Sequence, residues 1–430
     1  MSLIALALLA VLATALVAGV WVFGAMIITG AFALTVFRDI PLDSVVSRIL
    51  WNATTNSELI ALPLFILMAE ILFRTRLSAM LFAGLAPWTS WLPGRLLHVN
   101  VLGCTMFAAI CGSSAATAAT VGRITLTELS ARGYDRRLAL GSLAGAGTLG
   151  FLIPPSIIMI IYGVLAETSI LKLFIAGIVP GLGLALGYMS AIALLSNGAR
   201  KAPGAETYSW GERLRGLLEL APTLGLISAV VGTLYLGIAT PSESAVIGVF
   251  GSLLVSALHR SLTWKNMRAA FLAAVRTSSM MGLILAAGIF LSVALGYVGL
   301  PQFFANEIAA LNLQPLALVA LLALLYLVLG CFLDGTSMIV MTLPITLPLV
   351  VSAGFDKIWY GIFIVLMVEL AQITPPIGFN LFVIQSLTGE PVRNIARYAL
   401  PFFFVTLLFT FFITLFPQFV LFLPGLAGHR

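Results

Sequence analysis

Long apolar blocks recur along this chain of 430 residues, from Ser2 to Pro424. Each block is about as long as a helix must be to cross a lipid bilayer, roughly 20 residues. Only 9% of the residues are charged, whereas 61% are hydrophobic. A water-soluble protein of this length needs far more charge to cover its surface. The blocks therefore predict an all-α polytopic membrane protein, and they leave no stretch long and polar enough for a soluble catalytic domain.

Ten of these blocks are predicted to be transmembrane spans. They cover residues 2–18, 20–37, 58–74, 138–164, 171–195, 221–238, 242–258, 277–298, 357–387 and 398–423. Two further apolar intervals, 97–127 and 315–351, are interrupted near their middle by glycine and small hydroxyl residues. Each half of these intervals is too short to cross comfortably, so we expect two re-entrant hairpins. Non-helical backbone at such depth must be buried in protein or line a wet cavity.

The net charge is +6, from 22 Lys and Arg against 16 Asp and Glu. In a membrane protein this balance reports topology rather than nucleic-acid binding, because Lys and Arg collect on the cytoplasmic side. Arg95, Arg123 and Arg132 lie at the ends of the first hairpin, which therefore looks cytoplasmic. The second hairpin is followed only by Asp356 and Lys357 and looks periplasmic. Ten spans with these assignments put both termini outside the cytoplasm.

The two halves of the chain correspond. Gly112 matches Gly335 and Ser114 matches Ser337 at one offset, and Pro154 matches Pro375 and Pro155 matches Pro376 at an offset two residues shorter. Each half reads as five spans and one hairpin. Because five is odd, the second half enters with opposite orientation, and two inverted-topology repeats are typical of secondary transporters. Repeat 1 is predicted at 1–200 and repeat 2 at 221–430, joined by a cytoplasmic amphipathic linker at 201–220. A duplication in another kind of membrane protein is the alternative.

Each Pro-Pro pair falls inside a span, so 138–164 and 357–387 are expected to be broken helices. Proline removes a backbone donor and clashes with the preceding turn, so two in succession free carbonyl oxygens from the helical ladder. Carbonyl and hydroxyl oxygens without a formal charge suit a sodium ion. The helix that restarts after each break or hairpin tip points its positive end at the membrane midplane, which suits a carboxylate.

We therefore predict two sodium sites, one in each repeat, with the substrate between the two hairpin tips. The first sodium site is predicted to contain Ser113, Ser114, Thr117, Gly150 and Pro154, and the second Gly335, Thr336, Ser337, Thr374, Gly378 and Asn380. The substrate is predicted to contact Ser114, Pro155, Ser156, Ser337, Pro376 and Asn380. For any one of these residues the alternative is structural, since Ser and Thr in helices often bond to their own backbone.

Buried acids offer a competing coupling ion. Glu70, Asp334 and Glu369 fall inside apolar segments, where a charge costs about 2.5–3.5 kcal/mol on insertion scales. Such acids can carry protons, or they can pair with a neighbour or bond to backbone. We prefer the structural interpretation of all three. Glu243, at a span boundary, is read as a helix-start residue.

Neither an enzyme nor a transition-metal protein is predicted. The three cysteines, Cys104, Cys111 and Cys331, have no metal-type spacing and are an odd number for a disulfide framework. No nucleophile–base pair or metal cluster is found at membrane depth. Sodium is thus the only cofactor expected, with no organic cofactor.

Several motifs together resemble the large membrane subunit of tripartite ATP-independent periplasmic (TRAP) transporters, the DctM-like proteins. They are LPLFILMAE at 62–70, GSSAAT at 112–117, GFLIPPS at 150–156, ATPSE at 239–243 and ITPPIG at 373–378. The resemblance covers essentially the whole chain and the combination is specific. Ala69 stands where glycine is expected, and Ser242 where threonine is expected.

This resemblance implies an elevator-type transporter of the bacterial inner membrane, in which a hairpin-bearing domain slides against a scaffold. It implies two partners, a small four-helix membrane subunit on a separate chain and a periplasmic substrate-binding protein. Members of the family usually couple to sodium and import carboxylates such as C4-dicarboxylates, sialic acid and other organic acids. The binding protein selects the ligand, so this chain does not identify it.

Two alternatives remain at this stage. One is a stand-alone sodium- or proton-coupled dicarboxylate carrier of similar architecture, which would copurify with no small subunit. The other is a channel or membrane scaffold without coupled turnover, which sodium-dependent uptake requiring the binding protein would exclude.

Overall fold

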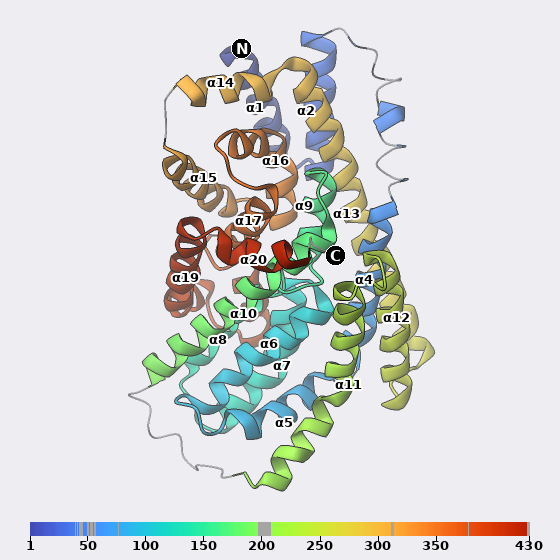
Figure 1. Cartoon of the computed structure of the whole chain (residues 1–430), viewed down its shortest axis with the longest axis vertical. Coiled ribbons are helices and arrows are strands. Elements are labelled where there is room, and N and C mark those ends of the chain that lie inside the picture. The colour runs from blue at the N-terminus through green and yellow to red at the C-terminus, as the bar shows by residue number, and fades with distance from the viewer. Residues whose placement is uncertain are drawn as a thin grey trace.

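Helices joined by short turns make up the computed structural model of this chain (Figure 1). The structure describes residues 1–430 except 39, 41, 43–45, 50, 52–54, 56, 76, 197–207, 311–313, 377 and 428–430. Within these described ranges every regular element is a helix, and six helices are long and apolar enough to cross a membrane. The prediction of an all-α membrane protein with several spans is confirmed.

The first half of the chain contains α1 (Ser2–Val17), α2 (Val22–Phe37), η1 (Ser57–Ile60), α4 (Ala61–Phe73), α5 (Leu77–Thr89), η2 (Arg95–Leu97), α6 (His98–Cys111), α7 (Ser114–Ala131), α8 (Arg136–Thr148), α9 (Ile157–Leu165) and α10 (Ile170–Leu195). The second half contains α11 (Trp210–Tyr235), α12 (Pro241–Leu258), α13 (Trp264–Val298), α14 (Leu300–Ala310), α15 (Pro315–Gly330), α16 (Gly335–Ser352), α17 (Lys357–Gln372), α18 (Phe379–Thr388), α19 (Val392–Leu415) and α20 (Gln418–Ala427).

The described helices differ from the expected spans in several places, and the expected span 398–423 is divided between α19 and α20. Residues 210–220, expected in the linker, are the first turns of α11, because a capping box between Ser209 and Glu212 starts the helix there. The rest of the expected linker, 201–207, lies outside the described residues. α13 begins at Trp264, well before residue 277, because Thr263 caps it and neither Gly nor Pro interrupts its basic first turns. α5 was not expected as a separate helix.

One group of helices forms the side of the molecule drawn on the right in Figure 1, and we call α2, α4, α11, α12 and α13 the scaffold group. α2 packs along α13, and α4 packs along both α12 and α13. Glycines allow the close approach. A Cβ at Gly30 of α2 would lie 2.7 Å from the Phe290 ring of α13, and one at Gly248 of α12 would lie 2.3 Å from Met68 Sδ of α4.

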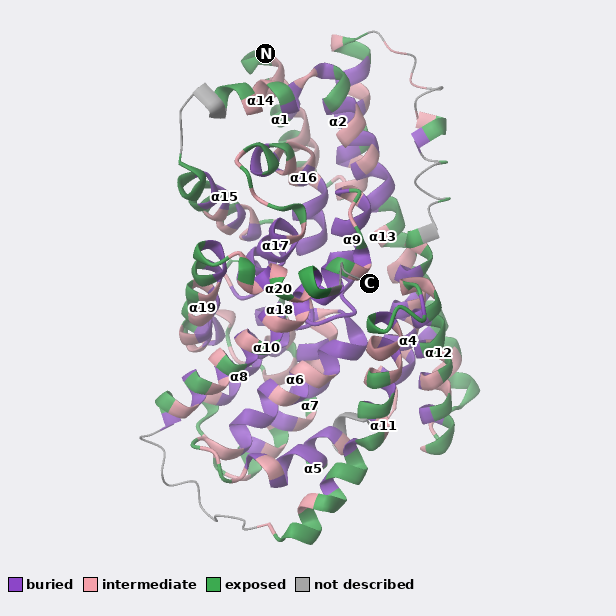
Figure 2. Ribbon diagram, viewed as in Figure 1, coloured by how far each residue is buried: buried purple, intermediate pink, exposed green. Residues whose placement is uncertain are grey.

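The remaining core surrounds α17. We call α6–α9 and α15–α18 the hairpin group, and α10 and α19 pack against it. From Trp359 to Gln372 every residue of α17 is buried, and Figure 2 shows this helix enclosed at the centre of the group. The hairpin group meets the scaffold group where α16 packs on α13 and where α6 packs on α4.

Helix-to-loop transitions in this group fall at the Gly, Ser and Pro motifs of the sequence. α6 and α7 are separated by residues 112–113, and α15 and α16 by residues 331–334. α8 and α9 are separated by residues 149–156, and α17 and α18 by residues 373–378. Both Pro-Pro peptide bonds, Pro154-Pro155 and Pro375-Pro376, are cis. Each half thus contains a helical hairpin followed by an interrupted helix.

Candidate functional site

Two hairpin tips and two helix breaks lie inside the hairpin group. We name residues 112–114 the first tip and 149–156 the first break. Residues 331–337 are the second tip and 373–378 the second break. The first tip and the first break belong to the first half of the chain, and the second pair belongs to the second half.

The first tip is docked directly on the first break. Gly112 has φ +61°, and a Cβ there would lie 2.5 Å from the Pro155 carbonyl oxygen. The Ile157 N–H donates to the Gly112 carbonyl oxygen at 3.3 Å. A Cβ at Gly150 would lie 2.7 Å from the Ser113 carbonyl oxygen. Only glycine permits this backbone-to-backbone contact, because any side chain at either position would collide with a carbonyl group.

The contact gathers carbonyl oxygens that the helices do not use. In the described chain, no backbone N–H donates to the carbonyl oxygens of Gly150, Ile153, Pro154 and Pro155. The Ser113 carbonyl oxygen accepts from both the Thr117 N–H at 3.0 Å and the Thr117 hydroxyl at 2.7 Å. Carbonyl and hydroxyl oxygens are the ligands that hard cations take in proteins. The residues predicted for the first sodium site therefore lie together.

Two helix N-termini also point into this region. α7 begins at Ser114, directly after the first tip, and α9 begins at Ile157, directly after the first break. Ser156 caps α9, because its hydroxyl oxygen accepts from the Met159 N–H at 3.3 Å and donates to the Phe151 carbonyl oxygen. N-terminal helix ends carry partial positive charge and favour an anion. Ser114 and Ser156, predicted to contact substrate, are both fully buried.

Asn380 reaches the first tip from the other half of the chain. The Ser114 hydroxyl donates to Asn380 Oδ1 at 3.0 Å, and both residues are buried. Asn380 Nδ2 donates to the Ala144 carbonyl oxygen on α8 at 3.5 Å, and it would lie 3.2 Å from a Cβ at Gly147. This residue was predicted for the second sodium site. The structure instead packs its side chain against the first tip and α8.

The second tip is held by its own cap and by two neighbouring helices. Asp334 Oδ2 accepts from the N–H groups of Thr336 at 3.0 Å and Ser337 at 3.3 Å, and the Ser337 hydroxyl donates to Oδ1. The Thr336 hydroxyl lies 3.6 Å from Met281 Sδ of α13. A Cβ at Gly335 would lie 2.3 Å from the Val368 side chain of α17. These contacts are with α13, α17 and Asp334 rather than with Thr374 or Asn380.

The second break is more open than the first. Its contact with the second tip is made by Cys331, whose thiol donates to the Pro375 carbonyl oxygen at 3.4 Å. A Cβ at Gly378 would lie 2.8 Å from the Gln372 carbonyl oxygen and 2.9 Å from that of Thr374, so two carbonyl oxygens converge over Gly378. Pro375 and Pro376 are exposed, whereas their counterparts in the first break are buried.

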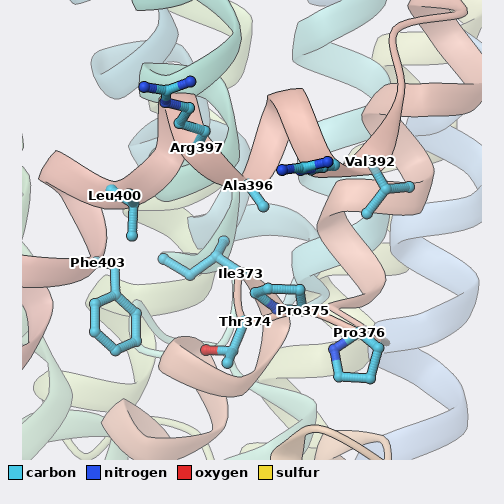
Figure 3. Close-up of a pocket in the computed structure, with 10 residues that line it drawn as sticks. Ile373, Thr374, Pro375, Pro376, Val392, Ala396, Arg397, Leu400 and Phe403 are labelled. Atoms are coloured by element: carbon cyan, nitrogen blue, oxygen red, sulfur yellow. The ribbon is translucent and has the colours of Figure 1, made fainter.

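A cavity of about 470 Å³ opens beside the second break (Figure 3). Its size is within the usual range for ligand pockets, about 300–1,000 Å³. It is lined by Ile373, Thr374, Pro375 and Pro376 of the break and by Val392, Arg393, Ala396, Arg397, Leu400 and Phe403 of α19. Neither Arg393 nor Arg397 was predicted as a site residue from the sequence. Their spacing of four places them on one face of α19, which is the signal in the sequence that could have found them.

The intramembrane acids have three different environments. Glu70 forms an ion pair with Arg74 one turn later on α4. Asp334 caps α16, and Glu243 closes a capping box with Thr240 at the start of α12. Each of these three acids thus has the ion-pair or capping partner that the structural interpretation expects. Glu369 is fully buried, and neither of its carboxyl oxygens has a hydrogen-bond partner in the described structure.

Known proteins resemble this chain along most of its length. The family described as "Tripartite ATP-independent periplasmic transporter, DctM component" matches residues 8–419. The C4-dicarboxylate TRAP transporter large permease protein of Pseudomonas aeruginosa is 31% identical over 402 residues, which cover 93% of this chain and 94% of that protein. The ectoine/5-hydroxyectoine TRAP transporter large permease protein of Ruegeria pomeroyi is 30% identical over 408 residues, covering 94% and 95%.

A solved structure has a similar arrangement of helices. The YdaH transporter of Alcanivorax borkumensis superposes with a TM-score of 0.52, over 90% of this chain and 88% of that chain, at 12% sequence identity. At this identity the similarity supports a common fold and says nothing about substrate.

Proposed function

Because the chain belongs to the DctM component family of the tripartite ATP-independent periplasmic transporters, we propose that it is the large permease subunit of a sodium-coupled importer of organic acids. The family consists of transporter permeases, not enzymes. Its description names this component as one of three, and relatives named large permease proteins imply a smaller membrane partner. We propose that the other two partners are a small four-helix membrane subunit and a periplasmic substrate-binding protein, and that the assembly works in the bacterial inner membrane.

Sodium coupling is supported by the donor set at the first tip and first break. The carbonyl oxygens of Gly150, Pro154 and Pro155 accept no backbone hydrogen bond in the described chain, and Ser113 and Thr117 add oxygens beside them. These oxygens fit a monovalent cation without any formal charge. We propose a second sodium site where the Gln372 and Thr374 carbonyl oxygens converge over Gly378.

Recognition of a carboxylate is supported by two positively charged features. The N-termini of α7 and α9 meet at the first tip, where Ser114, Pro155 and Ser156 would contact an anion. Arg393 and Arg397 line the cavity at the second break, beside Pro376. Two relatives are named for C4-dicarboxylate and ectoine, which are both organic acids.

Two inverted repeats and elevator movement are proposed from the packing pattern. α6 and α7 pack against α8, as α15 and α16 pack against α17. Likewise α18 packs on α7, and α9 packs on α16. We propose that the hairpin group, defined above, carries substrate and ions while sliding against the scaffold group. The contact between Thr336 and Met281 lies at the boundary that would move.

The energetics favour such coupling. A membrane potential of 100 mV supplies about 2.3 kcal/mol for each charge moved inward. Two sodium ions would therefore supply about 4.6 kcal/mol from voltage alone, which is more than a thousandfold in accumulation. Import of an anion against the same field needs a contribution of this size.

The observation that carries the proposal is the family match over residues 8–419, with the docking of the first tip on the first break as its structural counterpart. The test is uptake into proteoliposomes that contain this chain, its small subunit and the loaded binding protein. We expect uptake with a sodium gradient and none with potassium or choline. Ser114→Ala should weaken sodium dependence, whereas Ser190→Ala should not, because the exposed Ser190 hydroxyl only bonds to Leu186 of its own helix.

Three outcomes would contradict the proposal. Uptake indifferent to sodium would remove the coupling, and uptake without the small subunit would indicate a stand-alone carrier. Equilibration without accumulation would indicate a channel.

A further inference from the structure

Glu369 lies in the last turn of α17, the helix that is buried from Trp359 to Gln372. Its exposed fraction is 0%, and neither carboxyl oxygen has a hydrogen-bond partner among the described residues. Each of the other membrane acids discussed above has an ion-pair or capping partner. Glu369 has no such partner among the described residues, and neither sodium site proposed above uses it.

Hydroxyl groups from three other helices form a chain beside this carboxyl. Thr148, the last residue of α8, has its hydroxyl beside the Glu369 carboxyl and donates to the Gly145 carbonyl oxygen of its own helix at 2.7 Å. The Thr148 hydroxyl lies 3.4 Å from the Tyr188 hydroxyl of α10, which lies 2.6 Å from the Thr406 hydroxyl of α19. All three hydroxyl residues are buried.

Charged groups on the neighbouring helices do not neutralise Glu369. Tyr188 is the titratable side chain that interacts with it from α10. On α9 and α15, Tyr162 and Tyr326 gather instead around Tyr360, toward the start of α17. Asp334, before α16, is engaged with the N–H groups of its own helix. The described residues of α18 and α20 carry no titratable group. The charged residues of α8, α10 and α19 lie in the first turns of those helices, whereas Thr148, Tyr188 and Thr406 lie farther along them.

Among the described residues, an ionised carboxylate in this place would have no counter-ion, and the Thr148 hydroxyl beside it is engaged with the Gly145 carbonyl oxygen. Burying an isolated charge is far more costly than burying a neutral polar group, so a group in such a site neutralises by taking up a proton. A protonated carboxyl is also a hydrogen-bond donor, and the Thr148 hydroxyl oxygen is an available acceptor. Thr148 directly precedes the first break, which holds Gly150 against the first tip.

We propose that Glu369 is a proton-binding site of this carrier, and that its protonation alters the conformation of the first break through Thr148. The carboxylate oxygen forms an O–H bond with a proton taken from water when the site opens, and returns that proton to water on release. The ligand is thus the proton itself, in addition to the sodium ions proposed above. The helices that enclose the site come from both halves of the chain, so a proton held there favours the conformation in which those halves are packed together.

The first experiment detects the bound proton without any transport substrate. Infrared spectra of the full-length chain in lipid membranes are recorded before and after exchange into deuterated water. We expect the carbonyl stretch of a buried protonated carboxylic acid in the unmodified protein and in Glu219→Gln, a control at an exposed acid on α11. The band should disappear in Glu369→Gln. A band that persists in Glu369→Gln, or that is absent from the unmodified protein, would overturn the proposal.

The second experiment measures uptake against pH at a fixed sodium gradient. The unmodified carrier and Glu219→Gln should change their uptake rate with pH. Glu369→Gln mimics the protonated acid, so it should retain uptake and lose that dependence. Glu369→Asp keeps a titratable carboxyl and should retain the dependence with a displaced midpoint, which covers the case in which the glutamine variant fails to fold. An unaltered pH profile in Glu369→Gln, or a flat profile in an active Glu369→Asp, contradicts the inference. Loss of sodium dependence in the unmodified carrier would instead contradict the proposed function.

Discussion

Gly112 determines whether the first tip can close on the first break. Its φ of +61° costs any other residue about 1–2 kcal/mol. A Cβ there would also meet the Pro155 carbonyl oxygen at 2.5 Å, an overlap that costs a further 1–3 kcal/mol or so. We expect Gly112→Ala to lower sodium-driven uptake by about tenfold or more at equal membrane abundance, since each 1.4 kcal/mol is a factor of ten.

Gly237→Ala is the matched control for this substitution. Gly237 has a similar φ of +66°, but a Cβ there has nothing within 4 Å. Both variants carry the same backbone penalty, so only the collision distinguishes them. Equal uptake by the two variants would show that docking of the first tip is not needed for transport.

Asn380 connects the two halves of the site through its hydrogen bond with Ser114. Asn380→Ala should weaken sodium activation of uptake by about tenfold, because it leaves the buried Ser114 hydroxyl without its acceptor, a loss of about 1–3 kcal/mol. In a double-mutant cycle, Ser114→Ala combined with Asn380→Ala should cost much less than the sum of the single changes. The measurement is the sodium concentration for half-maximal uptake. Additive effects would mean that this bond does not couple the halves.

At the scale of single residues, the sequence predicts the backbone better than the side-chain partners. Gly112, Gly150 and the two Pro-Pro pairs identify the interruptions because their conformational properties are local. The partner of Asn380 was not predictable, because it depends on how α18 packs across α7. The lack of a hydrogen-bond partner for Glu369 among the described residues was not predictable for the same reason, because it depends on how several helices pack around α17.

The face of α19 that lines the cavity combines apolar residues with two guanidinium groups. Arg393 and Arg397 are four residues apart and both line the cavity. Figure 3 shows Arg397 with Ala396 and Leu400 nearby. Replacing either arginine by glutamine should raise the substrate concentration for half-maximal uptake about tenfold, because a charge-assisted hydrogen bond contributes about 1.5–3 kcal/mol.

Arg215→Gln on α11 is the control for these variants, because Arg215 is exposed and is not among the residues that line the cavity. An unchanged half-saturating concentration in both cavity variants would exclude this cavity from the substrate path.

Helix types and most boundaries were predictable because apolar length and Gly, Ser and Pro interruptions are strong local signals. The start of α11 was missed, because the capping box at Ser209 outweighs the polar composition of the turns that follow. α5 was missed because arginines flank it and Gly84 and Pro87 lie within it. Gly84 is there for packing, as a Cβ would lie 2.6 Å from Leu220 of α11.

For the whole molecule, the proposed sliding of the hairpin group would break the contact between α16 and α13. In a chain without its three native cysteines, the pair Thr336→Cys and Met281→Cys should form a disulfide on oxidation, because the two native side chains are in contact, with Thr336 Oγ1 and Met281 Sδ 3.6 Å apart. Oxidation should stop uptake, and a reducing agent should restore it. Full uptake by the oxidised, cross-linked protein would rule out movement at this boundary. Each single-cysteine variant should be insensitive to oxidant.

The bond between Ser114 and Asn380 also constrains how the chain is made. The two residues are 266 positions apart, so the first hairpin leaves the ribosome well before α18 exists. At about 5–20 residues per second, the interval is on the order of tens of seconds. Throughout that time the first tip lacks the acceptor for its buried hydroxyl. Biogenesis therefore passes through a half-made chain in which the contact between the first tip and α18 cannot yet form.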